Sequence, residues 1–416
     1  MDAACAIFFV ASTAAVVSVP DRPQYICLNN NQQWNPGVPA SFTQESVDVM
    51  LAAVKNSRGS ADGRVRLCLG FDFWIFFSGN ITTMVKSAEK IVALVEANDI
   101  PISLSIDPTQ WWTTRPDLWN WWNASAPGFN DSNRLNVEWT SWDPKRNATA
   151  LSWRNWGSQF RMPTPAPNFA SPAFRRAVEE TMLPIATVFA KWYSKLPIHK
   201  RYLLAYVRCT QELWEGTNYF VFPDSSLPSG PNPQFANKSD DPTTGVKGSV
   251  QIGYAAVCTG NSKRCSGTVT SADLDAVVND FITFSGGLLA RAGIPRSRLM
   301  SHTGAFWSPH TPNTSMAWNT PAAAVTTVAA PGWSLYGGVE QNPGKALGLE
   351  AAIAQVEGTP WGAPEWLRTF DNSGSTSEWL KVRTWCTYLT LLSFCVFDMP
   401  LSNVISSCTY INFLLH

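Results

Sequence analysis

The sequence predicts an α/β protein of the (β/α)₈ TIM-barrel class, with long loop insertions after strands three and four. Three observations predict it. After residue 24, short apolar, β-rich runs alternate with longer segments whose apolar residues recur at the helical period. About eight such units fit in the chain, and their strands are apolar enough to be buried on both faces. There is no G-x-G-x-x-G or P-loop, which an open nucleotide-binding sheet would need after its first strand.

Each predicted strand is a short apolar run, and each predicted helix carries one apolar stripe. In chain order, the strands are residues 25–28, 64–70, 102–106, 202–207, 298–301, 333–336, a short run just before Glu365, and 388–397. The helices are residues 44–55, 82–97, 171–193, 272–292, 320–330 and 343–357. Because helices separate the strands, neighbouring strands are expected to be parallel, with their carboxyl ends at one mouth.

Three segments divide the chain. Residues 1–24 begin with an almost wholly apolar stretch, which predicts a signal peptide, although the positive charges that usually start one are missing. The alternative interpretation is that this segment forms a buried first strand. Residues 25–397 form the predicted barrel. Residues 398–416 form an atypical tail, too short and too β-branched for a final barrel helix, as a truncated chain would have.

Two long insertions follow predicted strands. Residues 108–170, after strand three, contain nine of the 20 Trp, and residues 217–271, after strand four, are rich in Pro, Gly, Ser and Asn. Loops that follow strands lie at the carboxyl-terminal mouth of a barrel, where such enzymes keep their active sites. We therefore expect the Trp-rich insertion to form one wall of a cleft.

The charge balance excludes several classes of partner. Lys and Arg number 31, as do Asp and Glu, so the net charge is zero, and like charges do not form long runs. This argues against nucleic acid and against an anionic membrane surface. No stretch of about 18 apolar residues follows the leader, so we expect no membrane association once the leader is removed.

The cysteines and sequons bear on localisation. Cys258 and Cys265 flank a short polar loop, which suits a local disulfide. Four other cysteines lie in apolar runs and are expected to be buried thiols: Cys27, Cys68, Cys209 and Cys395. Six glycosylation sequons begin at Asn80, Asn123, Asn130, Asn147, Asn237 and Asn313. With the leader, these features predict a secreted or lumenal glycoprotein, in the extracellular space, cell wall or vacuole.

Polar residues at the strand tips predict a sugar site. Asp72 and Asp107 are expected to accept sugar hydroxyls or to anchor hydrogen bonds at the mouth. Further tip residues that we expect to bind substrate are Asn30, Gln211, His302 and Tyr336. His302 has a plainer alternative as a structural hydrogen-bonding residue. With four His and no His-Glu-x-x-His, we expect no metal, and we expect no cofactor.

Tryptophans near the strand tips are candidates for stacking on pyranose rings. They are Trp111, Trp112, Trp307 and Trp361. The alternative for most tryptophans of the insertion is that they pack a large loop which has to bury itself.

Carboxylates are the remaining candidates for catalysis, because no G-x-S-x-G nucleophile elbow is present. Hydrolysis of a glycosidic bond needs one protonated and one ionised carboxyl group. The segment Arg-Cys-Thr-Gln-Glu-Leu-Trp-Glu-Gly, residues 208–216, follows strand four, and Pro-Trp-Gly-Ala-Pro-Glu-Trp, residues 360–366, lies near the end of strand seven.

Glutamates after the fourth and seventh strands resemble the arrangement of the clan-A retaining glycoside hydrolases, the β-galactosidase and cellulase-like superfamily. The resemblance extends over about residues 25–397 and implies that Glu212 is the acid/base and Glu365 the nucleophile. The family's usual Asn-Glu pair is Gln211-Glu212 here, which leaves the substrate type open. A retaining pair predicts carboxyl groups about 5–5.5 Å apart, whereas an inverting pair would be about 6.5–9.5 Å apart.

Several alternatives stay open at this point. Glu215 could replace Glu212 as the acid, and Glu365 could be a carboxylate at a helix amino terminus. The leading hypothesis is a retaining glycoside hydrolase acting on an oligo- or polysaccharide. The alternative is a non-catalytic carbohydrate-binding barrel, and a third option is a barrel lyase or isomerase. The sugar, the linkage and the oligomeric state do not follow from the sequence.

Overall fold

The computed structural model describes residues 23–366 and 410–414, with gaps inside the first range. The gaps are residues 30–33, 54–55, 57, 60–64, 78–79, 110–111, 151, 156–158, 163, 217–218, 221–250, 261, 305–316, 336–347 and 357–359. The predicted leader before residue 23, the predicted strand 388–397 and Cys395 lie outside the described residues.

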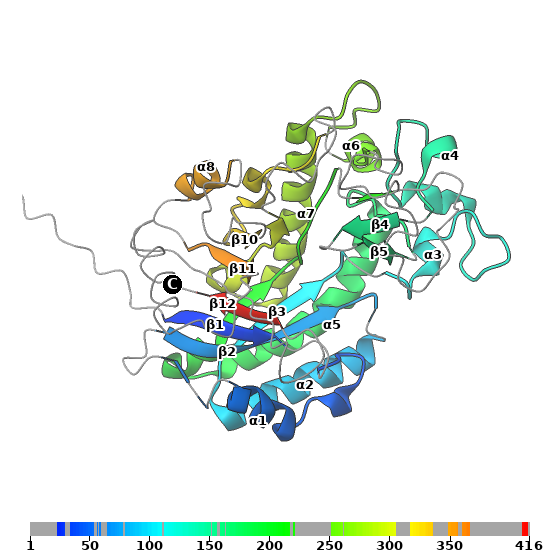
Figure 1. Ribbon diagram of the computed structural model, residues 1–416. Coiled ribbons are helices and arrows are strands. Elements are labelled where there is room, and N and C mark those ends of the chain that lie inside the picture. The colour runs from blue at the N-terminus through cyan, green and yellow to red at the C-terminus, as the bar shows by residue number, and fades with distance from the viewer. Residues whose placement is uncertain are drawn as a thin grey trace, which may run out of the picture.

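The described strands form a mixed α/β structure with two mainly parallel sheets. Five strands are parallel neighbours in the order β1 (Gln24–Asn29), β2 (Val65–Trp74), β3 (Ile102–Asp107), β6 (Leu204–Arg208) and β8 (Leu299–Met300). A second parallel sheet contains β9 (Thr303–Gly304), β10 (Gly332–Leu335) and β11 (Gly362–Trp366). Only two residues separate β8 from β9, so one stretch of chain links the sheets. Figure 1 shows β10 and β11 of the second sheet above β1, β2 and β3. The first seven predicted strands are thus confirmed near their expected positions.

The last described strand departs from an all-parallel barrel. β12 (Tyr410–Leu414) pairs antiparallel with β1, with Tyr25 opposite Leu414, and it also lies near β11. The residues of this strand, Tyr-Ile-Asn-Phe-Leu, are mostly aromatic or β-branched and favour extended backbone. The tail that we expected to be atypical therefore supplies a strand. Closure of the sheets into an eight-stranded barrel stays a prediction.

Four long helices match predicted ones: α1 (Gln44–Ala53), α2 (Ile81–Asn98), α5 (Pro172–Lys195) and α7 (Ser271–Ala292). α5 packs against both α2 and α7, and Figure 1 shows α1 and α2 along one side of the sheet. Capping residues define their ends. The Asn80 side chain accepts a hydrogen bond from Thr83 N at the start of α2, and Thr270 with Asp273 forms a capping box on α7.

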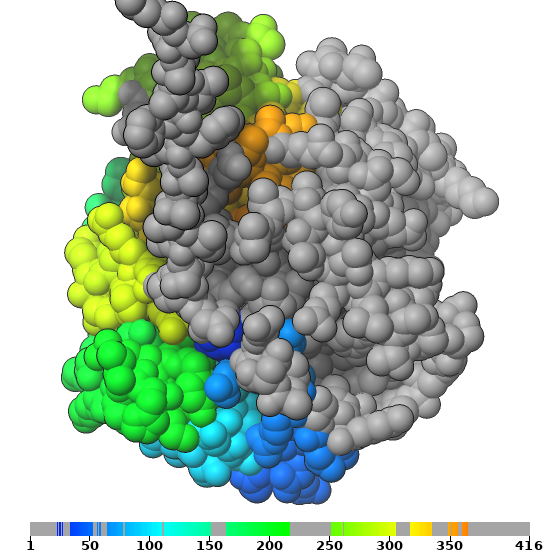
Figure 2. Space-filling model, turned by 90° about the vertical axis from the view of Figure 1, so that its left-hand side faces the viewer, coloured from blue at the N-terminus to red at the C-terminus, as the bar shows by residue number. Residues whose placement is uncertain are grey.

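The remaining described helices are short. They are η1 (Pro39–Ser41), α3 (Pro116–Trp119), η2 (Asp131–Leu135), α4 (Pro144–Asn147), η3 (Ile198–Leu203), α6 (Tyr254–Thr259), η6 (Arg296–Arg298), η8 (Pro321–Ala324) and α8 (Leu349–Ala354). Figure 2 shows the face at the left of Figure 1, where the green segment around η3 and the yellow-green segment around η6 lie side by side. Arg298 joins them by donating hydrogen bonds to the carbonyls of Arg201 and Ala205.

The predicted helix 320–330 is wrong over most of its length. Only the 3-10 helix η8 forms there, and Ala330 instead continues in extended backbone beside Met300. Ala330 N donates to Leu299 O, and Ser301 N donates to Ala330 O. Asp275 on α7 accepts from both the backbone N and the hydroxyl of Thr320, which fixes the start of η8. Tertiary hydrogen bonds therefore override a weak helical pattern.

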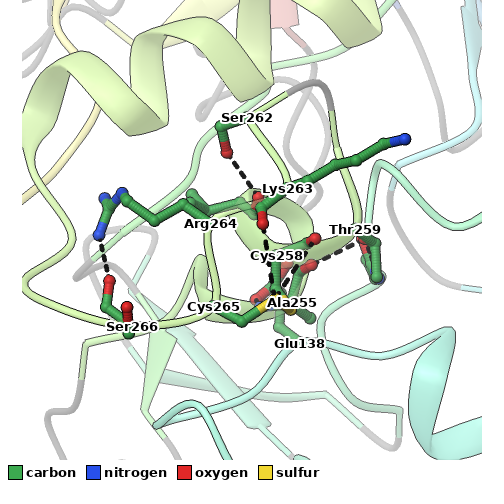
Figure 3. Close-up of a disulfide and its surroundings, with 11 residues drawn as sticks. Glu138, Ala255, Cys258, Thr259, Ser262, Lys263, Arg264, Cys265 and Ser266 are labelled. Atoms are coloured by element: carbon green, nitrogen blue, oxygen red, sulfur yellow. Dashed lines mark hydrogen bonds between the residues drawn. A yellow bond between two sulfur atoms is a disulfide. The ribbon is translucent and has the colours of Figure 1, made fainter.

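Two disulfides are present among the described residues. Cys258–Cys265 confirms the predicted local bond (Figure 3). Cys27 and Cys68 were expected to be thiols, but they occupy paired positions on β1 and β2 and are bonded to each other. Parallel pairing brings their Cα atoms to 4.2 Å, a proximity that neither apolar run reveals alone. Cys209 is a buried thiol as predicted, and burial raises its pKa to about 12.

The Trp-rich insertion contains α3, η2, α4 and two antiparallel strands, β4 (Ser152–Asn155) and β5 (Gln159–Met162). β4 also pairs with β7 (Tyr219–Phe220), so a strand of the second insertion joins the first. Five indoles donate Nε1–H to main-chain carbonyls: Trp112, Trp119, Trp121, Trp139 and Trp142. These tryptophans therefore pack the insertion, which was the plainer alternative for them.

Glu138 joins the two insertions. Its side chain is fully buried, and Oε2 accepts hydrogen bonds from the backbone N of Gly253 (2.9 Å), Ala255 (3.1 Å) and Trp139 (3.2 Å). Oε1 accepts from Ala256 N at 2.9 Å. Figure 3 shows Glu138 close to Ala255 of α6 and to the Cys258–Cys265 disulfide. One carboxyl group thus serves four backbone donors from both insertions.

We predict that Glu138→Ala destabilises the protein by about 3 kcal/mol or more, because it leaves several buried N–H groups without an acceptor. Glu138→Gln, which keeps one oxygen acceptor, should cost less. Urea denaturation measures both. As a control, Glu179→Gln removes an exposed carboxylate and should change the free energy of unfolding by less than about 1 kcal/mol. A cost for Glu138→Ala no larger than this control would contradict the prediction.

The same carboxyl group should make stability depend on pH. Burial raises the pKa of Glu138 to about 7, against the backbone N–H bonds that lower it. The unfolded chain releases this proton at a lower pH than the folded protein does. Glu138 therefore stabilises the fold most at acidic pH, and this contribution is lost as the pH rises through about 7. Glu138→Gln should lack that loss when unfolding is measured from pH 4.5 to 7.5.

Candidate active site

Polar side chains line one face of the parallel sheet in two successive rows. In the first row, Asp72 of β2 pairs with Ser105 of β3, which in turn pairs with Arg208 of β6. Two residues further along, Trp74 pairs with Asp107. Residues in register on parallel strands project from the same face, and every second residue repeats that face. Both rows therefore lie on one face, with the second nearer the carboxyl ends of the strands.

Asp72 and Arg208 form a buried ion pair that spans the first row. Arg208 Nη2 donates to Asp72 Oδ1 at 2.7 Å, and their side chains are only 3% and 1% exposed. The pair joins β6 to β2 across β3. Of the two roles expected for Asp72, the structure therefore supports the hydrogen-bond anchor rather than the sugar-hydroxyl acceptor.

Asp107 anchors the end of β3 in the same way. Its Oδ1 accepts from the backbone N of Thr109 at 2.9 Å and from the Thr109 hydroxyl at 2.5 Å. That hydroxyl lies 3.5 Å from the carbonyl oxygen of Gln211. The turn after β3 therefore lies next to the segment after β6.

Trp74 is a site residue that the sequence analysis missed. β2 continues to Trp74, four residues beyond the predicted strand, so the predicted end of this strand came too early. Its Nε1 donates to Gln211 Oε1 at 2.9 Å, and its half-buried ring lies 6.0 Å from that of Phe77. Phe77 is 47% exposed. The alternation of Phe and Trp around Asp72 was the available signal for a longer strand.

Glu212 lies four residues after the end of β6 and has a left-handed backbone conformation, with φ of 45°. The residues around it are held by His302: Leu213 N donates to His302 O at 2.9 Å, and the Thr210 hydroxyl donates to the same oxygen at 3.0 Å. Such a conformation costs a non-glycine residue of order 1–3 kcal/mol and is concentrated at functional sites. Glu212 is 6% exposed.

Glu215 has a different environment. Its side chain is fully buried, its backbone N donates to Asn319 Oδ1 at 2.8 Å, and its carbonyl accepts from Asn319 N at 3.1 Å. A Cβ at Gly253 would lie 3.7 Å from Glu215 Oε1, so the carboxyl group faces the second insertion.

His302 connects the segment that carries Glu212 to the strand beside Glu365. Its Nε2 lies 2.8 Å from Ser334 Oγ, and Ser334 pairs in register with Glu365 of β11. Burial lowers the pKa of His302 well below its usual value, and the nearby Arg208 lowers it further, so the ring is neutral. His302 is fully buried and bonded to protein groups, as its structural alternative expects, and a contact with sugar stays a prediction.

The other predicted site residues lie either in the core or outside the described residues. Trp112 is 1% exposed and packs edge-on against Phe174, and Trp361 is buried against Trp333. Both indoles therefore lie in the core, and their stacking on sugar stays a prediction. Four predicted contacts lie outside the described residues: Asn30, Trp111, Trp307 and Tyr336. The side chain of Glu365 does too, so its distance from the Glu212 carboxyl group stays a prediction.

Within the described part of the chain, no three His, Cys, Asp or Glu side chains are grouped so that they could hold a metal ion. The described helices also include none with the length and apolar character needed to span a membrane.

Comparison with known proteins gives structural similarities but no sequence match. No protein family model matches the sequence, and no curated protein matches it. Among solved structures, the chain is similar to the catalytic domain of β-amylase from Paenibacillus polymyxa. The TM-score is 0.48 at 10% sequence identity, over 92% of this chain and 93% of that chain.

We predict that Asp72→Asn lowers the free energy of unfolding by about 3–5 kcal/mol, because it leaves the buried Arg208 guanidinium without its counter-charge. The matched control is Glu179→Gln, which breaks the exposed ion pair with Arg291 and should cost less than about 1 kcal/mol. Urea denaturation of both variants at pH 7 compares the two. Equal effects would show that the Asp72–Arg208 pair does not hold the first row together.

Proposed function

We propose that this protein is a glycoside hydrolase that cleaves an oligo- or polysaccharide with retention of configuration. Glu212 is the acid/base and Glu365 the nucleophile. The observation that carries the proposal is the backbone of Glu212, which is left-handed four residues after a parallel strand and held on both sides by His302. Leu213, next to Glu212, forms a bridge with Thr303 of β9. Glu365 lies on β11, which is separated from β9 by the single strand β10.

The proposed reaction uses both carboxyl groups twice. Glu212 donates a proton to the leaving oxygen while the Glu365 carboxylate attacks the anomeric carbon, so the glycosidic bond breaks and a glycosyl ester forms. Glu212, now ionised, then takes a proton from water, which attacks the same carbon and releases Glu365. The first step needs Glu212 in its protonated form and the second needs it ionised.

Burial also favours Glu212 over Glu215 as the acid. Glu212 keeps some exposed surface, whereas the Glu215 side chain is completely enclosed beside Gly253. A general acid has to come within hydrogen-bond reach of the leaving oxygen. We therefore assign Glu215 a packing role between the second insertion and the segment after β6.

Sugar binding is proposed for the residues around this pair. The half-buried ring of Trp74 and the exposed ring of Phe77 lie side by side, and Trp74 is hydrogen-bonded to Gln211, the neighbour of Glu212. Asn30, Trp111, Trp307 and Tyr336 stay in the proposed substrate-binding set from their sequence positions. The proposed substrate is an oligo- or polysaccharide, and the proposed reaction needs no cofactor.

We also propose that the protein acts outside the cytosol, in a secreted or lumenal setting. Two disulfides among the described residues support this, because such bonds persist mainly in oxidising compartments.

The test compares Gln variants of the two glutamates on a panel of aryl glycosides. Glu365→Gln removes the attacking charge, so kcat should fall by several orders of magnitude on every substrate while oligosaccharide binding survives. Glu212→Gln should slow substrates with poor leaving groups most, because an activated aryl leaving group needs little protonation. Both variants should melt within a few degrees of the wild type.

Glu215→Gln serves as the matched control. It should lower stability and leave the dependence of rate on the leaving group unchanged. If the wild type binds oligosaccharides in calorimetry but hydrolyses no member of the panel, the non-catalytic carbohydrate-binding barrel replaces this proposal. If Glu215→Gln alone shows the leaving-group effect, the acid/base assignment moves to Glu215.

A further inference from the structure

His302 contacts the chain on both sides of Glu212. Its carbonyl oxygen accepts hydrogen bonds from Leu213 N at 2.9 Å and from the Thr210 hydroxyl at 3.0 Å, and its own N lies 3.1 Å from that hydroxyl. Leu213 also forms a parallel bridge with Thr303. The residues that flank Glu212 are therefore bonded to one short stretch of the neighbouring strand. This bonding stabilises the left-handed conformation that Glu212 adopts.

The side chain of the same residue reaches the strand next to Glu365. His302 Nε2 and Ser334 Oγ are 2.8 Å apart, and both groups are fully buried. Ser334 lies between Gly304 of β9 and Glu365 of β11 in the register of the second sheet. His302 and Ser334 therefore form a continuous link from the Glu212 segment to the strand position of Glu365.

The link is made of neutral groups. Arg208 of β6 is the charged group that acts on His302, and it is itself paired with Asp72 of β2. Ser334 of β10, Thr210 and Leu213 contribute uncharged contacts. A neutral imidazole 2.8 Å from a hydroxyl group is a short spacer, and both residues are fully buried in a close-packed interior, which limits their movement.

We propose that His302 is a positioning residue that sets the distance between Glu212 and Glu365. It holds the first glutamate through its main chain and the strand of the second through its bond to Ser334. The inference rests on the proposed function, in which the separation of the two carboxyl groups decides whether the nucleophile reaches the anomeric carbon. Misplacement of a reacting group by about 1 Å can cost a hundredfold in rate.

Two amide substitutions at His302, to Gln and to Asn, distinguish a positioning role from general damage to the structure. The terminal group of Gln reaches the place of the imidazole Nε2, so His302→Gln keeps a hydrogen bond to Ser334. Asn is shorter and ends near the place of Nδ1, so His302→Asn breaks that bond. Ser334→Ala removes the bond from the other side. All three variants leave the main-chain bonds to Thr210 and Leu213 available.

We expect His302→Asn and Ser334→Ala to lower kcat about 10- to 100-fold with KM within about threefold, and His302→Gln to stay within about threefold of wild type on both. The substrate is whichever aryl glycoside of the panel the wild type cleaves fastest. Combining His302→Asn with Ser334→Ala should lower kcat no further than either change alone, because both break one link. Equal kcat in His302→Asn and His302→Gln, or additive effects in the double variant, would overturn the proposal.

A second measurement does not depend on turnover. In protein labelled with ¹³C at the glutamate carboxyl groups, Gln substitution assigns the Glu212 and Glu365 signals, and their titration midpoints report the interaction between the two charges. His302→Asn and Ser334→Ala should shift both midpoints, and His302→Gln should leave them near the wild type. Unchanged midpoints in all variants would overturn the positioning role. If the midpoints shift while the wild type hydrolyses no aryl glycoside, the positioning role survives and the proposed hydrolase function fails.

Discussion

The structure depends on the need to satisfy polar groups that parallel strands bring together inside the protein. β2, β3 and β6 run side by side in register, so Asp72, Ser105 and Arg208 lie in one buried row. A lone carboxylate or guanidinium there would be strongly unfavourable, and the Asp72–Arg208 ion pair removes that cost. The ion pair leaves the first row with no net charge. The next row, which contains Trp74 and Asp107, follows it toward the strand ends.

The two insertions meet the same constraint with backbone donors instead of charges. Their described parts contain only short helices and short strands, so many main-chain groups there take partners from side chains. Glu138 accepts from four backbone N–H groups, and the tryptophan indoles donate to carbonyls. The abundance of Trp is explained in part by this task, since one indole fills a large volume and satisfies one carbonyl. The Cys258–Cys265 disulfide closes the loop after α6 next to this contact (Figure 3).

The candidate site contains residues that hold neighbouring segments in place and residues that are proposed to catalyse the reaction or bind sugar. Asp72, Asp107 and His302 are buried and bonded to protein groups, so they position neighbouring segments. Glu212 differs from them in its left-handed backbone, and Trp74 with Phe77 differs in exposure. A polar residue at a strand tip is therefore weak evidence for ligand contact. Its burial and partners decide between the two roles.

The sequence by itself determined the α/β class, seven of the strands, the four long helices and the disulfide between Cys258 and Cys265. These follow from local periodicity and short spacing, which act over a few residues. The tertiary structure alone decided the Cys27–Cys68 bond, the antiparallel strand β12, the loss of the helix expected at 320–330 and the burial of Trp112 and Trp361. Each of these depends on which distant segments become neighbours. Strand register and long-range hydrogen bonds set that choice, and no local pattern records it.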